Sequence, residues 1–209
     1  VSCRGHDMTQ RLRGNPTRYV RHYKHVDKFL PVSKSLMQPL LDTGCPPEKI
    51  ALLHSGIDVE KISFKPRVVE NESTVRFCSV GRLTQKKGHQ YSVAIINALR
   101  SKGFGASLAI VGEGEDRELI EEAISNFNLD DCVRLTGALQ HTETLAAIAN
   151  ADMFILHSVT AASNDQEGIP NVLKEAMALG RCVVSTWHSG IPELLEEGAL
   201  GILVHEKDV

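Results

Sequence analysis

The chain has 209 residues, of which 42 % are hydrophobic and 23 % are charged, a composition close to that of average globular proteins. This composition excludes a disordered chain, a coiled coil and a collagen-like fibre, and no apolar run approaches the roughly 20 residues that a membrane-spanning helix needs. The formal net charge of -3 excludes a chain-wide basic surface for nucleic acid.

Short apolar runs recur along the chain and predict β-strands, because each is bounded by Gly, Pro, Ser or Asp and most are rich in β-branched residues. The predicted strands are Phe29–Val32, Ile50–Leu53, Val75–Val80, Ser107–Val111, Val133–Thr136, Met153–Leu156, Cys182–Thr186 and Gly201–Val204. Several are apolar almost throughout, which is typical of strands buried on both faces of a parallel sheet.

Helices are predicted between these strands, where capping residues and terminal glycines mark their ends. The predicted helices are Thr17–His25, Lys34–Asp42, His89–Lys102, Asp116–Asn126, Thr142–Asn150, Ile169–Leu179 and Ile191–Glu197. From Val75 onward strand and helix alternate regularly. The sequence therefore predicts an α/β fold, with a parallel sheet and helices on both of its faces.

Composition divides the chain into two predicted domains. The polar stretch 64–74 interrupts the alternation and is expected to be an interdomain linker. Residues 1–63 are expected to be the last part of a preceding α/β domain, and residues 75–209 a ligand-binding domain. Residues 1–30 carry an excess of five positive charges and the rest an excess of eight negative charges, which supports this division. The abrupt start and end favour an excised piece, truncated within the second domain.

The segment Val80–Gly88, VGRLTQKKG, follows the first strand of the predicted ligand-binding domain. Ligands of open α/β sheets bind at the carboxyl ends of strands, and Gly81 allows a tight turn there. Arg82 and Lys87 would project over the same crevice, where both side chains can bind phosphate oxygens. A solvated basic surface loop is the alternative interpretation.

A second glycine-rich turn, Gly112-Glu113-Gly114, follows the next strand. A dinucleotide fingerprint needs a further glycine three residues on, and Arg117 stands there instead, so the motif argues against an NAD site. A tight turn with close backbone approach explains it equally well.

The third motif is NDQEGIPNVLKEAM, Asn164–Met177, and it predicts an anion site at a helix start. Pro170 suits the first helical position, and Gly168 permits a close backbone approach before it. The free amides of Asn171 and Val172 would then face the crevice with the positive end of the helix dipole.

Two glutamates of this motif are expected to accept hydrogen bonds from hydroxyl groups. Glu175 would bind a ribose diol, and Glu167 a sugar hydroxyl. Taken singly, each has an ordinary explanation, since Glu175 could be a surface glutamate and Glu167 could stabilise the helix dipole. Together the three motifs outline a nucleoside diphosphate sugar.

At these motifs the sequence resembles the retaining glycosyltransferases of family 4, which have the GT-B fold. Matching segments also include His54–Asp58, Thr136-Gly137 and Thr186–Glu193. Within the family, Val159–Gly168 resembles the bacterial colanic-acid and exopolysaccharide group. The resemblance implies two Rossmann-like domains facing a cleft, and transfer of a hexosyl group to a saccharide or lipid-linked saccharide. A UDP-sugar is favoured over a GDP-sugar as donor.

The resemblance also implies roles for individual residues. Arg82 and Lys87 would stabilise the leaving diphosphate, Glu167 would lie near the donor sugar, and Glu175 would bind the ribose. The backbone at Arg134–Thr136 and Leu139 would lie near the nucleobase. The other donor-binding positions that the resemblance implies are Gly81, Gly112, Leu135, Gly168, Ile169, Pro170, Asn171 and Val172.

No metal or cofactor is expected, because cations and helix amides can stabilise the departing phosphate and no Asp-x-Asp occurs. The nearest imitation is Asp165-Gln166-Glu167. One departure from the family concerns a histidine that many relatives place beside the donor sugar. Arg4 stands at that position and His6 lies two residues later, so the role of this stretch is left open.

A basic segment near the N-terminus suggests a second partner. Arg11, Arg18, Arg21, Lys24 and Lys28 could line a helix that meets an anionic membrane or a phosphorylated lipid acceptor. A solvated helix face is favoured over this hypothesis, because the opposite face is poorly apolar. The five cysteines show no C-x-x-C spacing, which argues against zinc and redox motifs and favours the cytoplasm, with at most peripheral contact at the inner membrane face.

Two other functions remain open from the sequence. A nucleotide-sugar epimerase or hydrolase of the same fold would need a further acid or base beyond the phosphate-binding residues, and the sequence offers none. A binding module without turnover is the other, and the piece by itself is expected to be inactive because half of the cleft would be absent.

Overall fold

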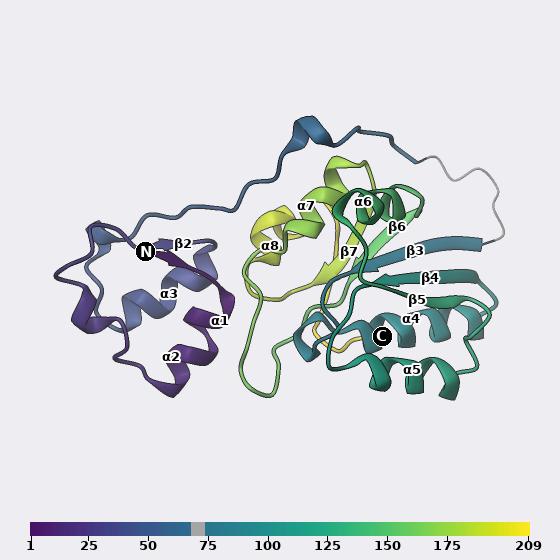
Figure 1. Ribbon diagram of the computed structural model, residues 1–209, viewed down its shortest axis with the longest axis horizontal. Helices are drawn as coiled ribbons and strands as arrows, with labels where there is room; N and C mark the ends of the chain where they lie inside the picture. Colours follow the sequence, from purple (N-terminus) through teal and green to yellow (C-terminus); the bar gives the residue numbers. More distant parts are fainter. Residues whose placement is uncertain (68–73) are drawn as a thin grey trace.

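A parallel β-sheet dominates the computed structural model, which describes residues 1–67 and 74–209 (Figure 1). Within the described residues the sheet has six strands in the order β5-β4-β3-β6-β7-β8, and every neighbouring pair is parallel. The strands are β3 Thr74–Val80, β4 Gly105–Val111, β5 Val133–Gly137, β6 Met153–Leu156, β7 Cys182–Thr186 and β8 Ile202–Val204. The chain leaves β3 toward one edge and returns at β6 toward the other, so the strand order reverses between β3 and β6.

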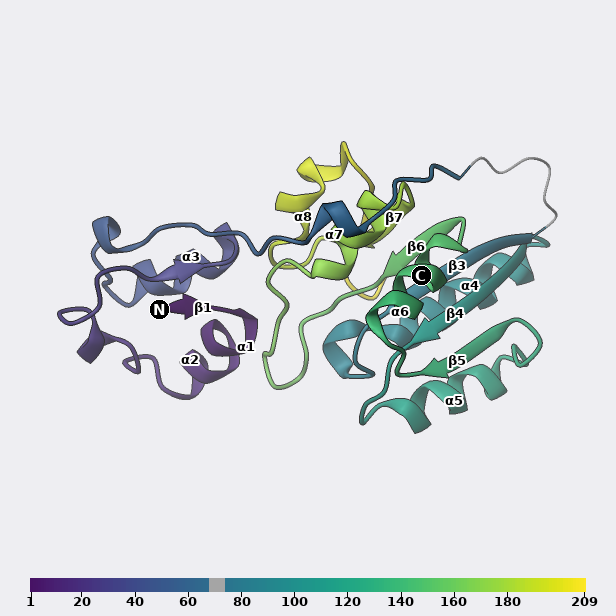
Figure 2. The same ribbon diagram turned by 45° about the horizontal axis from the view of Figure 1, so that its top comes forward.

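Helices cover both faces of this sheet, as the sequence predicts (Figure 2). The helices are α4 His89–Ser101, α5 Arg117–Asn126, α6 His141–Ala149, α7 Asn171–Ala178 and α8 Ile191–Leu194. Phe77 of β3 packs in the core beneath α4 and α5, whereas the next residue, Cys78, packs in the core beneath α6, α7 and α8. Alternating residues of one strand thus enter two cores, which explains why several strands are apolar almost throughout.

The residues before this sheet form a smaller N-terminal region, residues 1–54, around one core of their own. Its elements are β1 Ser2–Cys3, α1 Gly5–Met8, α2 Gln10–Gly14, β2 Leu30–Pro31 and α3 Lys34–Asp42. Phe29 is fully buried, and the ring of Tyr23 meets it edge to face at 5.5 Å. Helix α3 has the predicted bounds, because the Ser33 hydroxyl caps it by accepting from the Leu36 amide at 3.3 Å.

An extended connecting segment, residues 55–67, joins the N-terminal region to the sheet region, residues 74–209 (Figure 1). Ile62 packs against the core beneath α7, and the Lys65 amide donates to the Leu179 carbonyl at 3.4 Å. The Nε atom of Arg67 forms an ion pair with Oδ1 of the buried Asp152 at 2.6 Å. The predicted linker 64–74 includes residues 68–73, which lie outside the described residues, so its bounds stay a prediction.

Two sequence predictions for the N-terminal region are wrong. The predicted helix Thr17–His25 contains only a short 3-10 helix, Val20–His22, because turns suffice to bring both tyrosine rings onto Phe29. The predicted strand Ile50–Leu53 forms one isolated bridge to Phe29. Beyond this bridge the Leu53 amide donates to the Pro31 carbonyl at 2.9 Å, but the pairing is not completed because Pro31 has no amide hydrogen to donate in return.

Smaller differences concern the ends of elements. The sequence did not predict β1, α1 and α2, which are two to five residues long. Helix α7 begins at Asn171, so Pro170 immediately precedes the helix instead of occupying its first turn. Helix α8 ends at Leu194 and a 3-10 turn, Glu196–Gly198, follows it.

Candidate functional site

A cavity of about 460 Å³ lies between the N-terminal region and the sheet region. It opens where the strand order reverses, at the carboxyl ends of β3 and β6, which is the usual ligand position in such sheets. Its lining consists of Arg4, Gly5, His6, Val32, Ser55, Val80, Gly81, Arg82, Lys86, Lys87, Gln166, Glu167, Gly168, Ile169, Pro170, Asn171 and Val172. Nine of the predicted site residues are therefore brought together: Gly81, Arg82, Lys87, Glu167, Gly168, Ile169, Pro170, Asn171 and Val172.

The loop after β3 carries the basic side chains of this cavity. A 3-10 turn, Gln85–Lys87, ends at Gly88, whose φ of 62° lies in the left-handed region. A β-carbon at Gly88 would lie 1.9 Å from the carbonyl oxygen of His157, so a glycine is required for the loop to pack against the end of β6. This packing holds Lys86 and Lys87 over the cavity.

Three ion pairs join this loop to the loop before α7, and the longest of them runs from Nζ of Lys86 to Oε1 of Glu167 at 3.8 Å. The Nζ atom of Lys87 lies 3.1 Å from Oε1 of Glu167, and Nζ of Lys86 lies 2.9 Å from Oδ2 of Asp165. The four side chains are only 12–18 % exposed, so their charges interact more strongly than those of surface pairs. Arg82 is exposed and, within the described part of the chain, takes part in none of the ion pairs.

Helix α7 points its N-terminus at the same cavity. Asn171 and Val172 are its first residues, and their amides have no acceptor within the helix. The helix dipole adds a partial positive charge at this end. With Lys86, Lys87 and Arg82, the cavity therefore offers an anion site built from two neighbouring strand ends.

The opposite wall comes from the N-terminal region. Gly5 lies directly against the main chain of the α7 loop: a β-carbon at Gly5 would lie 2.2 Å from the carbonyl oxygen of Gln166. The amide of Gln166 donates to the Thr9 hydroxyl at 3.3 Å. Arg4 and His6 both line the cavity, and Nδ1 of His6 lies 3.8 Å from Asp165. The stretch whose role the sequence left open thus faces the predicted donor residues.

Glu175 lies outside the cavity lining, one helical turn beyond Asn171 on the same face of α7. Its Oε1 atom is 3.0 Å from Nε2 of His141, the first residue of α6. Gly112 is also outside the lining and packs behind the loop, where a β-carbon would lie 1.9 Å from the carbonyl oxygen of Gly81. Gly112 therefore allows the loop after β3 to pack closely against the end of β4.

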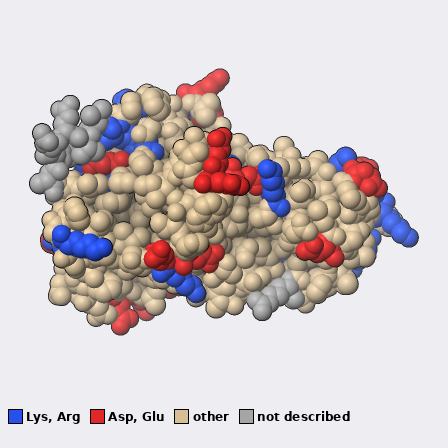
Figure 3. Space-filling model, turned by 180° about the vertical axis from the view of Figure 1, so that it is seen from behind, with Lys and Arg blue, Asp and Glu red and all other residues tan. Residues whose placement is uncertain are grey.

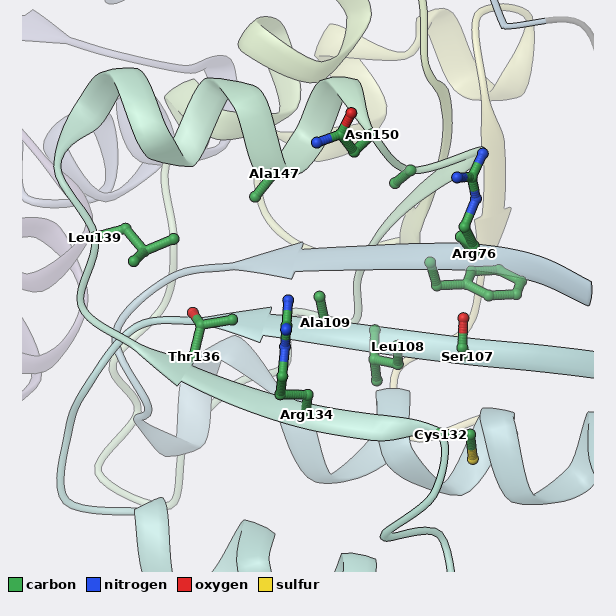
Figure 4. Close-up of a pocket in the computed structure, with 12 residues that line it drawn as sticks. Arg76, Ser107, Leu108, Ala109, Cys132, Arg134, Thr136, Leu139, Ala147 and Asn150 are labelled. Atoms are coloured by element: carbon green, nitrogen blue, oxygen red, sulfur yellow. The ribbon is translucent and has the colours of Figure 1, made fainter.

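The predicted nucleobase residues are not gathered at this cavity. Arg134 and Leu139 line a separate cavity of about 520 Å³ on the part of the sheet beside α6 (Figure 4). Figure 4 shows Arg134 projecting from β5 across this sheet face, with Thr136 beside it. Leu135 points to the other face and packs against the core beneath α4 and α5. Nucleobase contacts at these positions stay a prediction.

A buried histidine lies beneath the basic loop. His89, the first residue of α4, is 1 % exposed, and its Nδ1 atom lies 3.1 Å from the Ser79 hydroxyl. Burial and the nearby positive charge of Lys87 lower the pKa of His89 to about 4. The imidazole is therefore neutral at pH 7 and adds no charge to the site.

Sequence reasoning missed two features of the site. Lys86 was not predicted as a site residue. Its position next to Lys87 could have indicated it, because both lysines lie in the same 3-10 turn. His188 donates or accepts at both ring nitrogens: Nε2 lies 3.1 Å from the Glu167 amide and Nδ1 lies 2.6 Å from Oε1 of Glu206. No spacing in the sequence signals this contact, because three separate segments meet there.

The described residues hold no cluster of three or more His, Cys, Asp or Glu side chains that could bind a metal ion. Among them, no helix is both long enough and apolar enough to cross a membrane.

Comparison with known proteins places the chain in a family. Residues 74–209 match the family described as glycosyl transferases group 1. The chain is 38 % identical over 206 residues to the amylovoran biosynthesis glycosyltransferase AmsK of Erwinia amylovora, covering 98 % of this chain and 50 % of that protein. It is 40 % identical over 191 residues to the putative colanic acid biosynthesis glycosyltransferase WcaL of Escherichia coli, covering 91 % and 47 %. The chain thus spans about half the length of these relatives.

Solved structures show the same fold at low identity. The Anabaena protein Alr3699/HepE in complex with UDP and glucose superposes with a TM-score of 0.76 at 17 % identity, over 92 % of this chain and 53 % of that chain. The lipopolysaccharide outer core galactosyltransferase WaaB superposes with a TM-score of 0.67 at 19 % identity, over 86 % and 49 %. The GT-B fold and the resemblance to the colanic-acid and exopolysaccharide type are confirmed.

Proposed function

The chain belongs to the group 1 glycosyl transferases, and from this premise we propose that it forms the donor side of the cleft in a retaining hexosyltransferase. One observation carries the proposal: two lysines, one arginine, the amides that open α7 and Glu167 converge on a single cavity. In the proposed complex this cavity would hold the diphosphate and the sugar attached to it, and the nucleoside would lie beyond it, toward Glu175.

Glycosyl transfer builds negative charge on the departing nucleotide phosphate. In the proposed complex, Arg82 and Lys87 neutralise this charge together with the amides of Asn171 and Val172. Lys87 and the two amides are fixed by the loop after β3 and by α7, so these groups need little reorganisation during the reaction, whereas the exposed Arg82 would turn onto the phosphate. Glu167 partly neutralises Lys87 in the structure, and a bound phosphate would compete for that lysine.

Two carboxylates bind the hydroxyl groups that flank the diphosphate. Glu167 accepts hydrogen bonds from the donor sugar, and Glu175 accepts them from the ribose, where His141 now occupies one of its oxygens. Arg4 and His6 face Glu167 across the cavity and are placed to contact the sugar or the incoming acceptor.

We propose a UDP-sugar as donor and a saccharide or lipid-linked saccharide as acceptor, in surface polysaccharide synthesis. The Anabaena protein has been solved with UDP and glucose, and two relatives are named for amylovoran and colanic acid biosynthesis. The site would work in the cytoplasm, without a metal ion. Contact with an anionic membrane has weaker support, because on the face drawn in Figure 3 basic side chains stand singly or in small groups.

Titration calorimetry of this chain with UDP, GDP, UDP-glucose and GDP-mannose tests the proposal. We expect a uridine nucleotide to bind, and Arg82→Ala and Glu175→Ala each to weaken binding about 10- to 100-fold, since each removes a charge-assisted hydrogen bond. The matched controls are Arg100→Ala and Glu122→Ala, which remove exposed charges far from the cavity. No binding of any of the four compounds to folded protein would refute the donor site.

A further inference from the structure

The turn His188–Gly190, which follows β7, forms three hydrogen bonds with the main chain of Glu167 and Gly168. The Glu167 amide donates to Nε2 of His188 at 3.1 Å, and the Ser189 hydroxyl donates to the Glu167 carbonyl at 2.7 Å. The Gly190 amide donates to the Gly168 carbonyl at 3.2 Å. Both polar groups of the Glu167 main chain are therefore satisfied by one turn, whose residues lie outside the cavity lining.

The hydrogen bond from Glu167 defines the proton position on His188. A backbone amide can only donate, so Nε2 of His188 must be the acceptor and carries no proton. The proton is then on Nδ1, which donates to Oε1 of Glu206 at 2.6 Å. The ring is 1 % exposed, so it cannot exchange either partner for water without moving.

Glu206 connects this histidine to the far end of the same loop. Its Oε2 atom accepts from the Thr160 amide at 2.9 Å, and its Oε1 atom lies 3.3 Å from the Thr160 hydroxyl. Burial alone would raise the pKa of Glu206, but the hydrogen bonds from Thr160 and His188 outweigh it and the pKa lies below its ordinary value. The carboxylate thus stays ionised and anchors both ends of the loop 160–168.

We propose that His188 is a positioning residue for sugar recognition: held by Glu206, it holds the Glu167 main chain and so aims the Glu167 carboxylate at the donor sugar. The proposal rests on the proposed function, because it takes Glu167 to be the sugar acceptor. It goes beyond that function in assigning a task to a residue that does not touch the ligand. His188 lies outside the cavity lining and acts only through the main chain of Glu167.

Two substitutions separate the two bonds of His188. The amide group of Gln reaches the position of Nε2 and can accept from Glu167, whereas the shorter Asn reaches only the position of Nδ1 and can bond only to Glu206. His188→Gln should therefore keep the hydrogen bond from the Glu167 amide, and His188→Asn should lose it. A merely structural role for a buried polar ring would affect both variants alike. The control is His205→Asn, at an exposed histidine.

Hydrogen exchange gives a readout that needs no ligand. In His188→Asn the Glu167 amide loses its acceptor, and we expect its exchange to accelerate at least about fivefold at a temperature where the protein stays folded. In His188→Gln exchange should stay within about twofold of the wild type. Equal acceleration in both variants would overturn the positioning role.

Binding gives the second readout. Calorimetry with UDP and with UDP-glucose should show UDP-glucose affinity falling about tenfold in His188→Asn and recovering in His188→Gln, with UDP affinity changed by less than about twofold in both. Ser189→Ala, on the more exposed side of the turn, should give a smaller fall of the same kind, and it keeps the test decisive if a histidine variant does not fold.

The outcomes separate the two proposals. If the wild type binds neither UDP nor UDP-glucose, the donor site itself fails and the role of His188 fails with it. If the wild type binds both and His188→Asn keeps full affinity for UDP-glucose, the donor site stands and only the role of His188 is refuted.

Discussion

The N-terminal region and the sheet region use the same kind of parallel pairing but bury very different amounts of apolar side chain. In the N-terminal region, β1 and β2 pair over two residues each, and one core forms around Phe29. In the sheet region, strands buried on both faces separate two cores. The cavity wall that carries Arg82, Lys86 and Lys87 thus belongs to a region with two cores, whereas the opposite wall belongs to a region with one small core.

The two regions meet mainly through polar contacts. The carboxylate of Glu193 accepts from the Lys34 amide at 2.7 Å and lies 2.6 Å from Nε2 of His54. The Ser189 hydroxyl lies 3.0 Å from that of Ser35. Interfaces of this kind resemble transient ones and permit relative movement of the parts. The cavity between the regions is therefore expected to change width, and the predictions below test how independent the regions are.

The largest expected effect is in the core of the sheet region. Phe154→Ala should lower the free energy of unfolding by about 3–5 kcal/mol, because Phe154 is fully buried and its removal leaves a cavity. Phe29→Ala makes the same change in the N-terminal region and should loosen residues 1–54 while leaving the sheet protected. In both variants thermal unfolding measures the loss of stability, and hydrogen exchange measures which backbone amides lose protection. Equal loss of protection in β3 and β6 with either variant would show a single cooperative unit.

The next effect concerns acid and belongs to the sheet region. Since the pKa of His89 is about 4 when folded and 6.5 ordinarily, the unfolded chain binds more protons between these values. The contribution of the neutral His89 to the free energy of unfolding is complete above pH 6.5. It is lost as the pH falls toward 4, and the loss amounts to at most about 3 kcal/mol. His89→Asn keeps a partner for Ser79 and should flatten this part of the curve of unfolding free energy against pH. An unchanged slope would mean that His89 is protonated in the folded state.

A smaller effect is expected where the two regions touch. Gly5→Ala places a β-carbon against the Gln166 carbonyl, and the required shift should cost about 1–3 kcal/mol and weaken nucleotide-sugar binding. Gly14→Ala is the matched control, because its β-carbon would meet no atom within 4 Å. Thermal unfolding and calorimetry of both variants check this. Identical behaviour of the two variants would show that the regions are not in contact in solution.

The smallest expected effect is at the polar contact behind the cavity. Glu193→Ala removes the acceptor of the Lys34 amide and should cost about 1 kcal/mol, with faster hydrogen exchange at the start of α3. Glu122→Ala, an exposed residue of α5, should change stability by less than about 0.5 kcal/mol. Unchanged exchange at Lys34 would indicate that this contact is not populated in solution.

The sequence predicted the two regions unequally. In the sheet region each strand contains a short run rich in apolar residues, and all six were found, since burial leaves a signal within the segment itself. In the N-terminal region β1 has two residues and exists only through its partner β2, so no local pattern announces it. The segment Thr17–His25 was predicted to be a helix, but the rings of Tyr19 and Tyr23 reach Phe29 from turns.

The candidate site also has a part that the sequence predicted and a part that it did not. The loop Gly81–Gly88 and the stretch Glu167–Val172 are each contiguous, and the reversal of strand order brings their ends together, so both could be predicted. Arg134 and Leu135 are also adjacent in sequence, but successive residues of a strand point to opposite faces, and the structure separates them.

The sequence by itself therefore determined the sheet, its two helical layers and the two motifs that line the cavity, because each depends on residues that follow one another along the chain. Only the tertiary structure decided that Gly5 meets Gln166 and that His188 joins Glu167 to Glu206. These contacts join distant segments through single hydrogen bonds and close packing. Such contacts leave no periodicity, because their geometry exists only after distant segments of the chain have packed together.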